Sequence, residues 1–333
     1  MNILIVKFGA LGDVIRTTYF LKALYEKYDA PKIYWVTSLA ATDLLRFNPY
    51  IYKLTTDFGM LKSESFDLCL SLDDETEILE QVKNLKATKT TGAYLDGDVR
   101  KYSDDSSIWF DMGLISRFGK EEADRKKVAN TLSHTEIFST MLGVAIKDAS
   151  FYNSSLIENQ VANASYHDEV CIGINSGAGG RWESKKMPLQ EVILLIKKLT
   201  VKFGGNCKLR LLLLGGEAEK DRNEAIMNAV DNPCLELVDS NNSLLEFAAI
   251  VKSCNYLISS DSLALHMAIS QGVANLSFYA PTSAAEIDTF GTGVKVISTA
   301  PDYCSYSGDC DNSSITAERL FEAFEAHAAE INL

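Results

Sequence analysis

The chain has 333 residues, which is enough for two domains of ordinary size and too many for one comfortable hydrophobic core. Its composition, 47% hydrophobic and 23% charged, is that of a globular protein and excludes a disordered or fibrous chain. The formal net charge of -13 argues against a nucleic-acid-binding protein, because phosphate neutralisation requires an excess of Lys and Arg.

Short apolar runs bounded by turn residues alternate with longer segments of helical period, a pattern that predicts parallel sheets built from βα units. In the first half, strands are predicted at residues 2–6, 32–37, 51–54, 66–72 and 87–92, and helices at 13–28, 39–47, 75–86 and 131–142. In the second half, strands are predicted at 170–175, 209–214, 255–259, 275–279 and 294–298, and helices at 189–203, 219–230, 243–253, 262–271 and 315–329.

The segment between the two βα halves, residues 148–168, is polar, rich in Asn and Ser and nearly without periodicity, so it is predicted to be a linker. Residues 93–130 are also irregular and charged, and we interpret them as an extended loop beside a site rather than as sheet. Proteins of this class bind ligands at the carboxyl ends of their strands, here in a cleft between the domains.

Targeting features are missing from the sequence. The start, Met1 to Lys7, lacks the long apolar region of a signal peptide, and no apolar run approaches the roughly 18 residues of a membrane span. The seven scattered cysteines suit a reducing compartment. We therefore expect a cytoplasmic protein; if it meets a membrane, we expect peripheral contact through the less acidic N-terminal half.

The first segment that could carry chemistry is KFGALGDVIRTT, residues 7–18, where a buried strand runs through two glycines into an amphipathic helix. Asp13 sits at the helix start, and two interpretations are open. It is either an N-cap carboxylate, which is the commoner role, or a general base at the mouth of the sheet. The complete Gly-x-Gly-x-x-Gly pattern of dinucleotide binding is absent.

The second segment is NSGAGGRWESKKMP, residues 175–188, which begins where the first strand of the second half ends. Its small residues leave backbone N–H groups able to approach phosphate oxygens, and Arg181, Lys185 and Lys186 supply positive charge in an acidic protein. These features favour an anion site over a solvated loop. The glycine spacing is not that of a P-loop.

Two further segments follow apolar strands. In LLLLGGEAEKD, residues 211–221, acidic residues open a helix, where their charge complements the helix dipole or accepts from ribose hydroxyls. In NYLISSDSLALHMA, residues 255–268, polar residues open a helix and His266 falls about one turn in, either as a satisfied core histidine or beside a bound phosphate. FYAPTSAAE, residues 278–286, ends another strand at the same edge.

Together these segments resemble, in order and across nearly the whole chain, glycosyltransferase family 9, the ADP-heptose:lipopolysaccharide heptosyltransferase family. The resemblance is carried by the Gly12-Asp13 start with its Arg-Thr-Thr continuation, the glycine-rich loop leading to Lys185-x-x-Pro, Gly-Gly-x-x-Glu219, Asp261-Ser-x-x-x-His266, and Pro-Thr-Ser with Glu286. Leu263 stands where many members have Gly, and Met187 where Trp is frequent.

The resemblance implies a GT-B fold of two Rossmann-like, doubly wound parallel-sheet domains facing a central cleft. An acceptor-binding domain would span residues 1–160 and a nucleotide-sugar-binding domain 169–333, whose last helix is a candidate to pack back on the first. Asp13 would be the catalytic base, Lys185 would neutralise the donor diphosphate, Glu219 would hold the ribose, and Asp261 with His266 would bracket the phosphates. The implied donor-binding residues are Gly12, Ser176, Gly177, Arg181, Lys185, Glu219, Asp261, Ser262, His266 and Thr282.

The reaction implied is inverting transfer of a heptose or related sugar from a nucleoside-diphosphate sugar resembling ADP-heptose to a lipid-linked or oligosaccharide acceptor, such as lipopolysaccharide. No metal or other cofactor is expected, because Asp-x-Asp is absent and Cys304 and Cys310 lack the further ligands of a zinc site. Two alternatives stay open: an enzyme resembling a nucleotide-sugar epimerase, which needs no acceptor, and a catalytically silent nucleotide-sugar-binding module.

Overall fold

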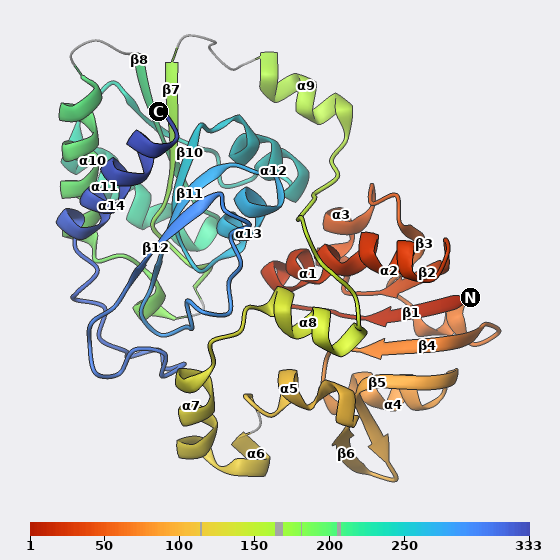
Figure 1. The fold of residues 1–333 in the computed structure, drawn as a ribbon. Helices are drawn as coiled ribbons and strands as arrows, with labels where there is room; N and C mark the ends of the chain where they lie inside the picture. Colours follow the sequence, from red (N-terminus) through yellow and green to blue (C-terminus); the bar gives the residue numbers. More distant parts are fainter. Residues whose placement is uncertain (114, 164–168, 181, 205–207) are drawn as a thin grey trace. The chain divides into compact units, whose positions relative to one another are not determined.

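The chain forms two compact units, Met1–Tyr152 (unit 1) and Asn153–Leu333 (unit 2) (Figure 1). The computed structural model describes residues 1–113, 115–163, 169–180, 182–204 and 208–333. In those ranges no helix combines the length and the apolar character needed to cross a membrane. Each unit is built around its own six-stranded sheet.

The sheet of unit 1 has the strand order β3-β2-β1-β4-β5-β6. Its strands are β1 (Asn2–Val6), β2 (Lys32–Val36), β3 (Ile51–Thr55), β4 (Ser65–Ser71), β5 (Lys86–Asp96) and β6 (Val99–Tyr102). All neighbours are parallel except β5 and β6. The helices of unit 1 are α1 (Leu11–Thr17), α2 (Leu21–Lys27), α3 (Thr42–Leu45), α4 (Thr76–Lys83), α5 (Ser107–Phe110), α6 (Ile115–Phe118), α7 (Lys120–Ala129) and α8 (His134–Leu142).

The central strand β1 is an uninterrupted run of Ile, Leu and Val after Asn2, and all four of those residues are buried. A strand that is apolar on both faces belongs in the middle of a parallel sheet that is covered by helices on both sides. Leu4 is paired in register with Tyr34 of β2 and Cys69 of β4, and these three side chains share one core cluster.

The segment from 93 to 130 is not an extended loop, and that interpretation is wrong. Strand β5 continues to Asp96, turns through Gly97 at a φ of 64°, and pairs with the antiparallel strand β6. Helices α5 to α7 follow. Ala93 and Phe110 form a small core of their own with Leu79 of α4. This satellite core holds few apolar residues, which is why the sequence shows so little periodicity here.

Unit 2 has the strand order β12-β11-β10-β7-β8-β9, and all of its strand pairs are parallel. Its strands are β7 (Glu169–Asn175), β8 (Lys208–Leu214), β9 (Leu235–Leu237), β10 (Tyr256–Ser260), β11 (Ala274–Tyr279) and β12 (Gly293–Ile297). Its helices are α9 (Ser155–Asn163), α10 (Leu189–Phe203), α11 (Lys220–Val230), α12 (Leu244–Ser253), α13 (Leu263–Ser270) and α14 (Ala317–Glu330).

The first and last helices of unit 2, α9 and α14, both pack within that unit. The segment predicted as a linker, 148–168, contains α9, which packs on α12 and is tied to it by an ion pair between Glu158 and Lys252 at 3.0 Å. The last helix, α14, packs on α10 and β12, and its buried Phe324 belongs to the core cluster of the unit.

Both sheets are doubly wound with equivalent strand orders, which confirms the predicted fold class. In each, the first strand lies between the second and the fourth, so the connection that follows the first strand and the one that leads into the fourth strand cross opposite faces of the sheet. Ligands of such sheets bind in the crevice beyond the carboxyl ends of these central strands. That position falls after β1 and β4 in unit 1, and after β7 and β10 in unit 2.

Candidate functional site

In unit 2, the loops that follow β7 and β10 are joined by a buried polar network. The Asn175 side-chain nitrogen lies 3.1 Å from the Ser259 hydroxyl and 3.0 Å from the Ser262 hydroxyl. The Ser260 hydroxyl donates a hydrogen bond of 2.9 Å to the carbonyl of Gly177. Satisfied buried networks of this kind hold their members in one arrangement. The two loops therefore form one rigid edge at the centre of the sheet.

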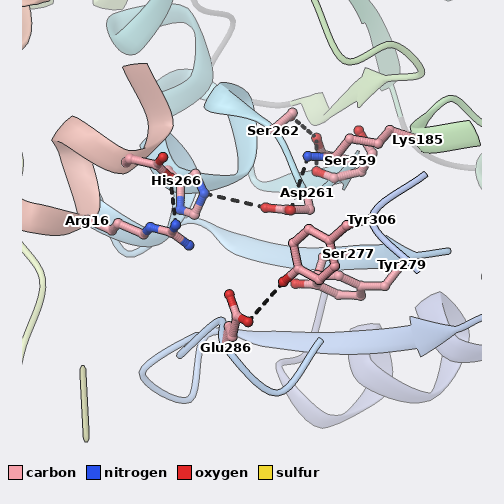
Figure 2. A network of polar contacts seen from close by, with 12 residues as sticks. Arg16, Lys185, Ser259, Asp261, Ser262, His266, Ser277, Tyr279, Glu286 and Tyr306 are labelled. Carbon is pink, nitrogen blue, oxygen red and sulfur yellow. Dashed lines mark hydrogen bonds and ion pairs between the residues drawn. The ribbon is translucent and has the colours of Figure 1, made fainter. Parts of the chain in front are cut away.

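A charged cluster lies at this edge (Figure 2). The Lys185 ammonium is 3.1 Å from one carboxylate oxygen of Asp261, and the other oxygen is 3.5 Å from Nε2 of His266. The side chains of Lys185 and Asp261 are only 13% and 15% exposed. Lys185 ends a short 3-10 helix, Glu183–Lys185, whereas His266 is the fourth residue of α13. The fold thus brings Lys185 to two predicted site residues, Asp261 and His266, the nearer of which is 76 residues away in the sequence.

The N-terminus of α13 follows the loop after β10, which carries Asp261 of this charged cluster. Ser262 is the N-cap residue of this helix, yet within the described part of the chain its side chain makes no capping hydrogen bond. Its hydroxyl belongs instead to the network with Ser259 and Asn175. The first N–H groups of a helix have no partner inside the helix, and together with the helix dipole they favour a bound anion.

Glu219 has a structural role that can be read from its contacts. It is 3% exposed, and its two carboxylate oxygens accept hydrogen bonds of 3.0 Å from the N–H groups of Gly179 and Gly216. It lies in the 3-10 turn that precedes α11, in the segment where the sequence predicts the helix start. Each ionised oxygen has more than one acceptor site, so these bonds leave capacity for a ribose hydroxyl.

Arg222 was not predicted from the sequence. Its Nε donates a hydrogen bond of 3.1 Å to the Ser176 hydroxyl, and a terminal nitrogen donates to the carbonyl of Met187. Burial lowers the pKa of Arg222, while Glu183 and Glu219 oppose that shift. Arg222 therefore ties both ends of the glycine-rich loop to α11. In the sequence, Arg222 could have been identified as a basic residue about one helical turn after Glu219.

The loop after β11 holds two further polar features. Thr282 is 6% exposed, and its hydroxyl has no hydrogen-bond partner among the residues that the structure describes. The Tyr306 hydroxyl donates a 2.9 Å hydrogen bond to Glu286 (Figure 2). Burial, followed by the charge of Glu286, raises the pKa of Tyr306 well above its usual value, and Asp261 contributes. Tyr306 lies in the Cys304–Cys310 segment, which the sequence did not mark as part of the site.

Gly12 and Asp13 lie in the first turn of α1 in unit 1. The N-cap of this helix is Ala10, not Asp13, which corrects the capping interpretation: Asp13 is the third residue of the helix. Its carboxylate accepts from the Ala10 N–H at 3.3 Å and pairs with Arg16 at 2.6 Å. The side chain is 31% exposed. A carboxylate in this position can meet a substrate.

The loop that leads to Asp13 is anchored where β1 and β4 end. The Lys7 ammonium pairs with Asp73, and each of these residues is 5% exposed. The second oxygen of Asp73 accepts from the N–H of Phe8. Burial raises the pKa of Asp73, and the charge of Lys7 works against that shift.

Arg181 lies outside the described residues. Among the residues that are described, no group of three or more His, Cys, Asp or Glu side chains has an arrangement that could hold a metal ion. Cys304 and Cys310 are both buried.

Solved structures of similar fold cover nearly the whole chain. A family 9 glycosyltransferase from Veillonella parvula DSM 2008 is 18% identical with a TM-score of 0.73, covering 99% of this chain and 97% of that one. The E. coli ADP-heptose lps heptosyltransferase II is 14% identical, with a TM-score of 0.69 and complete coverage of both chains. E. coli heptosyltransferase WaaC with ADP is 17% identical with a TM-score of 0.67, covering 98% of this chain and 100% of that one.

These likenesses confirm the GT-B fold for the two parallel-sheet units. No curated protein matches the sequence. The sequence pattern of glycosyltransferase family 9 (heptosyltransferase) matches residues 116–313, which is more than half of the chain. That stretch includes the rigid edge after β7 and β10 with its Lys185 cluster. The chain therefore belongs to glycosyltransferase family 9 and is a glycosyltransferase.

Proposed function

We propose that this protein is an inverting, metal-independent transferase that moves a heptose or related sugar from a nucleoside-diphosphate donor to a saccharide acceptor. Unit 2 binds the donor, and unit 1 binds the acceptor and supplies Asp13 as the base. The acceptor is lipopolysaccharide or a related lipid-linked saccharide or oligosaccharide, met at the cytoplasmic face of the membrane through peripheral contact. Family membership supports glycosyl transfer. The names of similar structures, which include ADP and ADP-heptose, support the donor class.

The observation that carries the donor assignment is that the Lys185 ammonium pairs with Asp261, the residue before the N-cap of α13, beyond the ends of β7 and β10. A diphosphate placed there meets an ammonium group and helix N–H groups that no side chain caps within the described residues. Asp261 keeps Lys185 in place before the donor arrives, at the cost of offsetting part of its charge. His266 contacts the same carboxylate, and in this proposal Asp261 and His266 lie on either side of the donor phosphates.

The leaving group in this reaction is a nucleoside diphosphate, and its negative charge grows as the glycosidic bond breaks. Charges and dipoles that are already oriented stabilise such a transition state without reorganisation. Lys185, fixed by Asp261, and the α13 N-terminus have that property. Glu219 orders the glycine-rich loop through Gly179, and in this proposal it also accepts a hydrogen bond from the donor ribose. Ser176, Gly177 and Thr282 complete the proposed donor site.

The acceptor hydroxyl must lose a proton as it attacks the anomeric carbon opposite the leaving diphosphate. Asp13 is suited to take that proton, because its carboxylate is held by Arg16 yet is 31% exposed. A positioned general base typically contributes roughly 10²- to 10⁴-fold to the rate. Attack from the side opposite the leaving group inverts the anomeric configuration.

The test is an assay of purified protein with ADP-heptose and a heptose-deficient lipopolysaccharide core oligosaccharide, with and without EDTA. We expect ADP release that requires the acceptor, is unchanged by EDTA, and gives a product whose anomeric configuration, read by NMR, is opposite to that of the donor. Turnover lost in EDTA and restored by manganese or magnesium would overturn metal independence. A donor isomer formed without acceptor would indicate an epimerase, and ADP binding without turnover of any sugar nucleotide a silent module.

A further inference from the structure

Arg16 connects Asp13 to a histidine that lies 118 residues away in the sequence. One terminal nitrogen of the guanidinium is 2.6 Å from Oδ1 of Asp13, and the other is 2.8 Å from Nδ1 of His134. The Arg16 side chain is 15% exposed. All three residues belong to unit 1. A planar guanidinium that is fixed at both terminal nitrogens has little freedom to rotate, so its contact with Asp13 has a defined direction.

His134 is itself held firmly. It is the first residue of α8, behind the N-cap Ser133, and it is 8% exposed. Its ring centroid lies 5.0 Å from that of Trp109, which packs on Phe138 of α8 with a centroid distance of 4.3 Å. The position of the imidazole is therefore fixed by the start of helix α8 and by packing against aromatic rings.

The hydrogen-bond chemistry fixes the form of His134. A guanidinium only donates, so Nδ1 must accept, and the imidazole is neutral with its proton on Nε2. A protonated ring would place a donor and a positive charge against Arg16. His134 is thus an acceptor that orients Arg16, and it does not act as an acid at that nitrogen.

Arg16 has two opposing effects on a base at Asp13. A guanidinium beside a carboxylate favours its charged form and so weakens it as a proton acceptor. It also fixes the direction of the carboxylate, and a misplacement of about 1 Å at a reacting group can cost roughly 10²-fold in rate. Arg16 engages Oδ1 in a charge-assisted bond, whereas Oδ2 accepts the longer, 3.3 Å hydrogen bond from the Ala10 N–H, and an ionised carboxylate oxygen has more than one acceptor site. A proton from the acceptor therefore goes to Oδ2.

We propose that Arg16 and His134 are positioning residues for this transferase: His134 orients Arg16, and Arg16 aims the carboxylate of Asp13 at the acceptor hydroxyl. This inference rests on the proposed role of Asp13 as the base. Neither residue has to touch either substrate. Helix α5, which carries Trp109, contributes to this arrangement because Trp109 packs on His134.

The first test compares two Arg–Asp pairs with the same spacing along a helix. Arg16→Gln should lower kcat on the order of 10- to 100-fold with ADP-heptose and the core oligosaccharide, while the donor KM and the Kd for ADP stay unchanged. The matched control is Arg46→Gln, since Arg46 pairs with Asp43 at 2.7 Å but is 58% exposed. It should leave kcat unchanged. Wild-type kcat in Arg16→Gln would overturn the proposal.

A double-variant cycle separates this inference from the proposed function. If Arg16 acts through Asp13, Arg16→Gln should cost turnover in the wild-type background and nothing further in Asp13→Asn. An equal loss in both backgrounds would show that Arg16 acts independently, and the inference would fail while Asp13 kept its role. Normal turnover in Asp13→Asn would instead refute the proposed role of Asp13 as the base, and the inference about Arg16 would fail with it.

His134 allows a rescue that does not depend on changing Arg16. The side-chain oxygen of Asn lies near the position of Nδ1, so His134→Asn should keep the acceptor for Arg16 and most of the turnover. His134→Leu keeps the volume but removes the acceptor, and we expect it to lower kcat with the Kd for ADP unchanged. Equal kcat in the two variants, at matched melting temperatures, would contradict the role of His134.

A carboxyl ¹³C NMR titration gives a readout that needs no acceptor. Arg16→Gln removes a cation 2.6 Å from Asp13, so the pKa of Asp13 should rise relative to the wild type. In Arg46→Gln the pKa of Asp13 should stay where it is in the wild type. An unchanged pKa of Asp13 in Arg16→Gln would show that the pair is not formed in solution and would overturn the proposal.

Discussion

The first strand of each unit leads into a loop that contains glycine, but the two loops are built differently. A Cβ added at Gly9, after β1, would meet nothing within 4 Å, whereas one added at Gly177, after β7, would lie 2.2 Å from Cγ of Glu219. The loop of unit 2 is closed around a buried carboxylate. The loop of unit 1 is anchored at Phe8 by Asp73 and is open at Gly9.

This difference matches the two tasks that we propose. A diphosphate presents the same oxygens in every donor of its class, so a loop that is fixed in advance by Glu219, Arg222 and Asn175 suits it. A saccharide acceptor requires access to the base, and the open loop before Asp13 leaves that side chain 31% exposed. Rigidity in unit 2 and access in unit 1 are therefore complementary features of one enzyme.

The largest effect is expected at the base. Asp13→Asn keeps the shape of the side chain and can still accept from the Ala10 N–H, but it cannot take a proton. Turnover should fall by about 10²-fold or more, with the melting temperature within a few degrees of the wild type. Single-turnover kinetics with ADP-heptose and the acceptor oligosaccharide measure this fall, and normal turnover would leave Asp13 with a structural role alone.

The contrast between the two glycine loops can be tested directly. Gly177→Ala forces a methyl group against Glu219, and overpacking of this kind costs about 1 to 3 kcal/mol. We expect a lower free energy of unfolding in urea together with weaker ADP binding. Gly9→Ala is the control, with a change in stability within about 0.5 kcal/mol. Equal effects of the two substitutions would refute the difference in packing.

Both units contain a helix that starts with the same capping arrangement, which allows a finer comparison. Ser133 caps α8 and Ser243 caps α12, each with a Glu three residues later. Ser133→Ala and Ser243→Ala should each lower the free energy of unfolding by about 1 kcal/mol. Only Ser133→Ala should also reduce turnover, because α8 positions His134. Loss of turnover in both variants would point to a general effect of destabilisation.

The smallest effect concerns pH. The Ser133 N–H and hydroxyl lower the pKa of Glu136, and those of Ser243 lower the pKa of Glu246. Each folded-state pKa lies below the unfolded value, so the stabilisation is present above the unfolded pKa and is lost as pH falls through the folded one. Glu136→Gln and Glu246→Gln should therefore each flatten the fall in melting temperature on acidification. Acid profiles identical to the wild type would contradict both bonds.

The sequence predicts the parts of the fold that show strong periodicity. Strand β1 and helix α10 have their predicted limits, because an all-apolar strand and a long amphipathic helix are distinct patterns. Strands β6 and β9 were missed, since each is short and β6 is polar. Residues 93–130 were misread for the same reason.

In the candidate site, the sequence marks residues within one segment but not the contacts between segments. Lys185 and Asp261 were each identified, yet their ion pair depends on a fold that brings positions 76 residues apart together. The Arg16–His134 contact and the role of Arg222 were missed for this reason. The helix was predicted to start at Asp13, which left the N-cap and base interpretations both open; α1 begins two residues earlier, at Leu11, and its N-cap is Ala10.

The division of work between the two units is tested most directly by titrating ADP into the wild type, Lys185→Ala and Asp13→Asn in a calorimeter. Lys185→Ala should weaken binding by on the order of 1.5 to 3 kcal/mol, the range for hydrogen bonds to charged groups. Asp13→Asn should bind ADP as the wild type does. Unchanged affinity in Lys185→Ala, or a comparable loss in Asp13→Asn, would contradict a donor site built by unit 2 and a base supplied by unit 1.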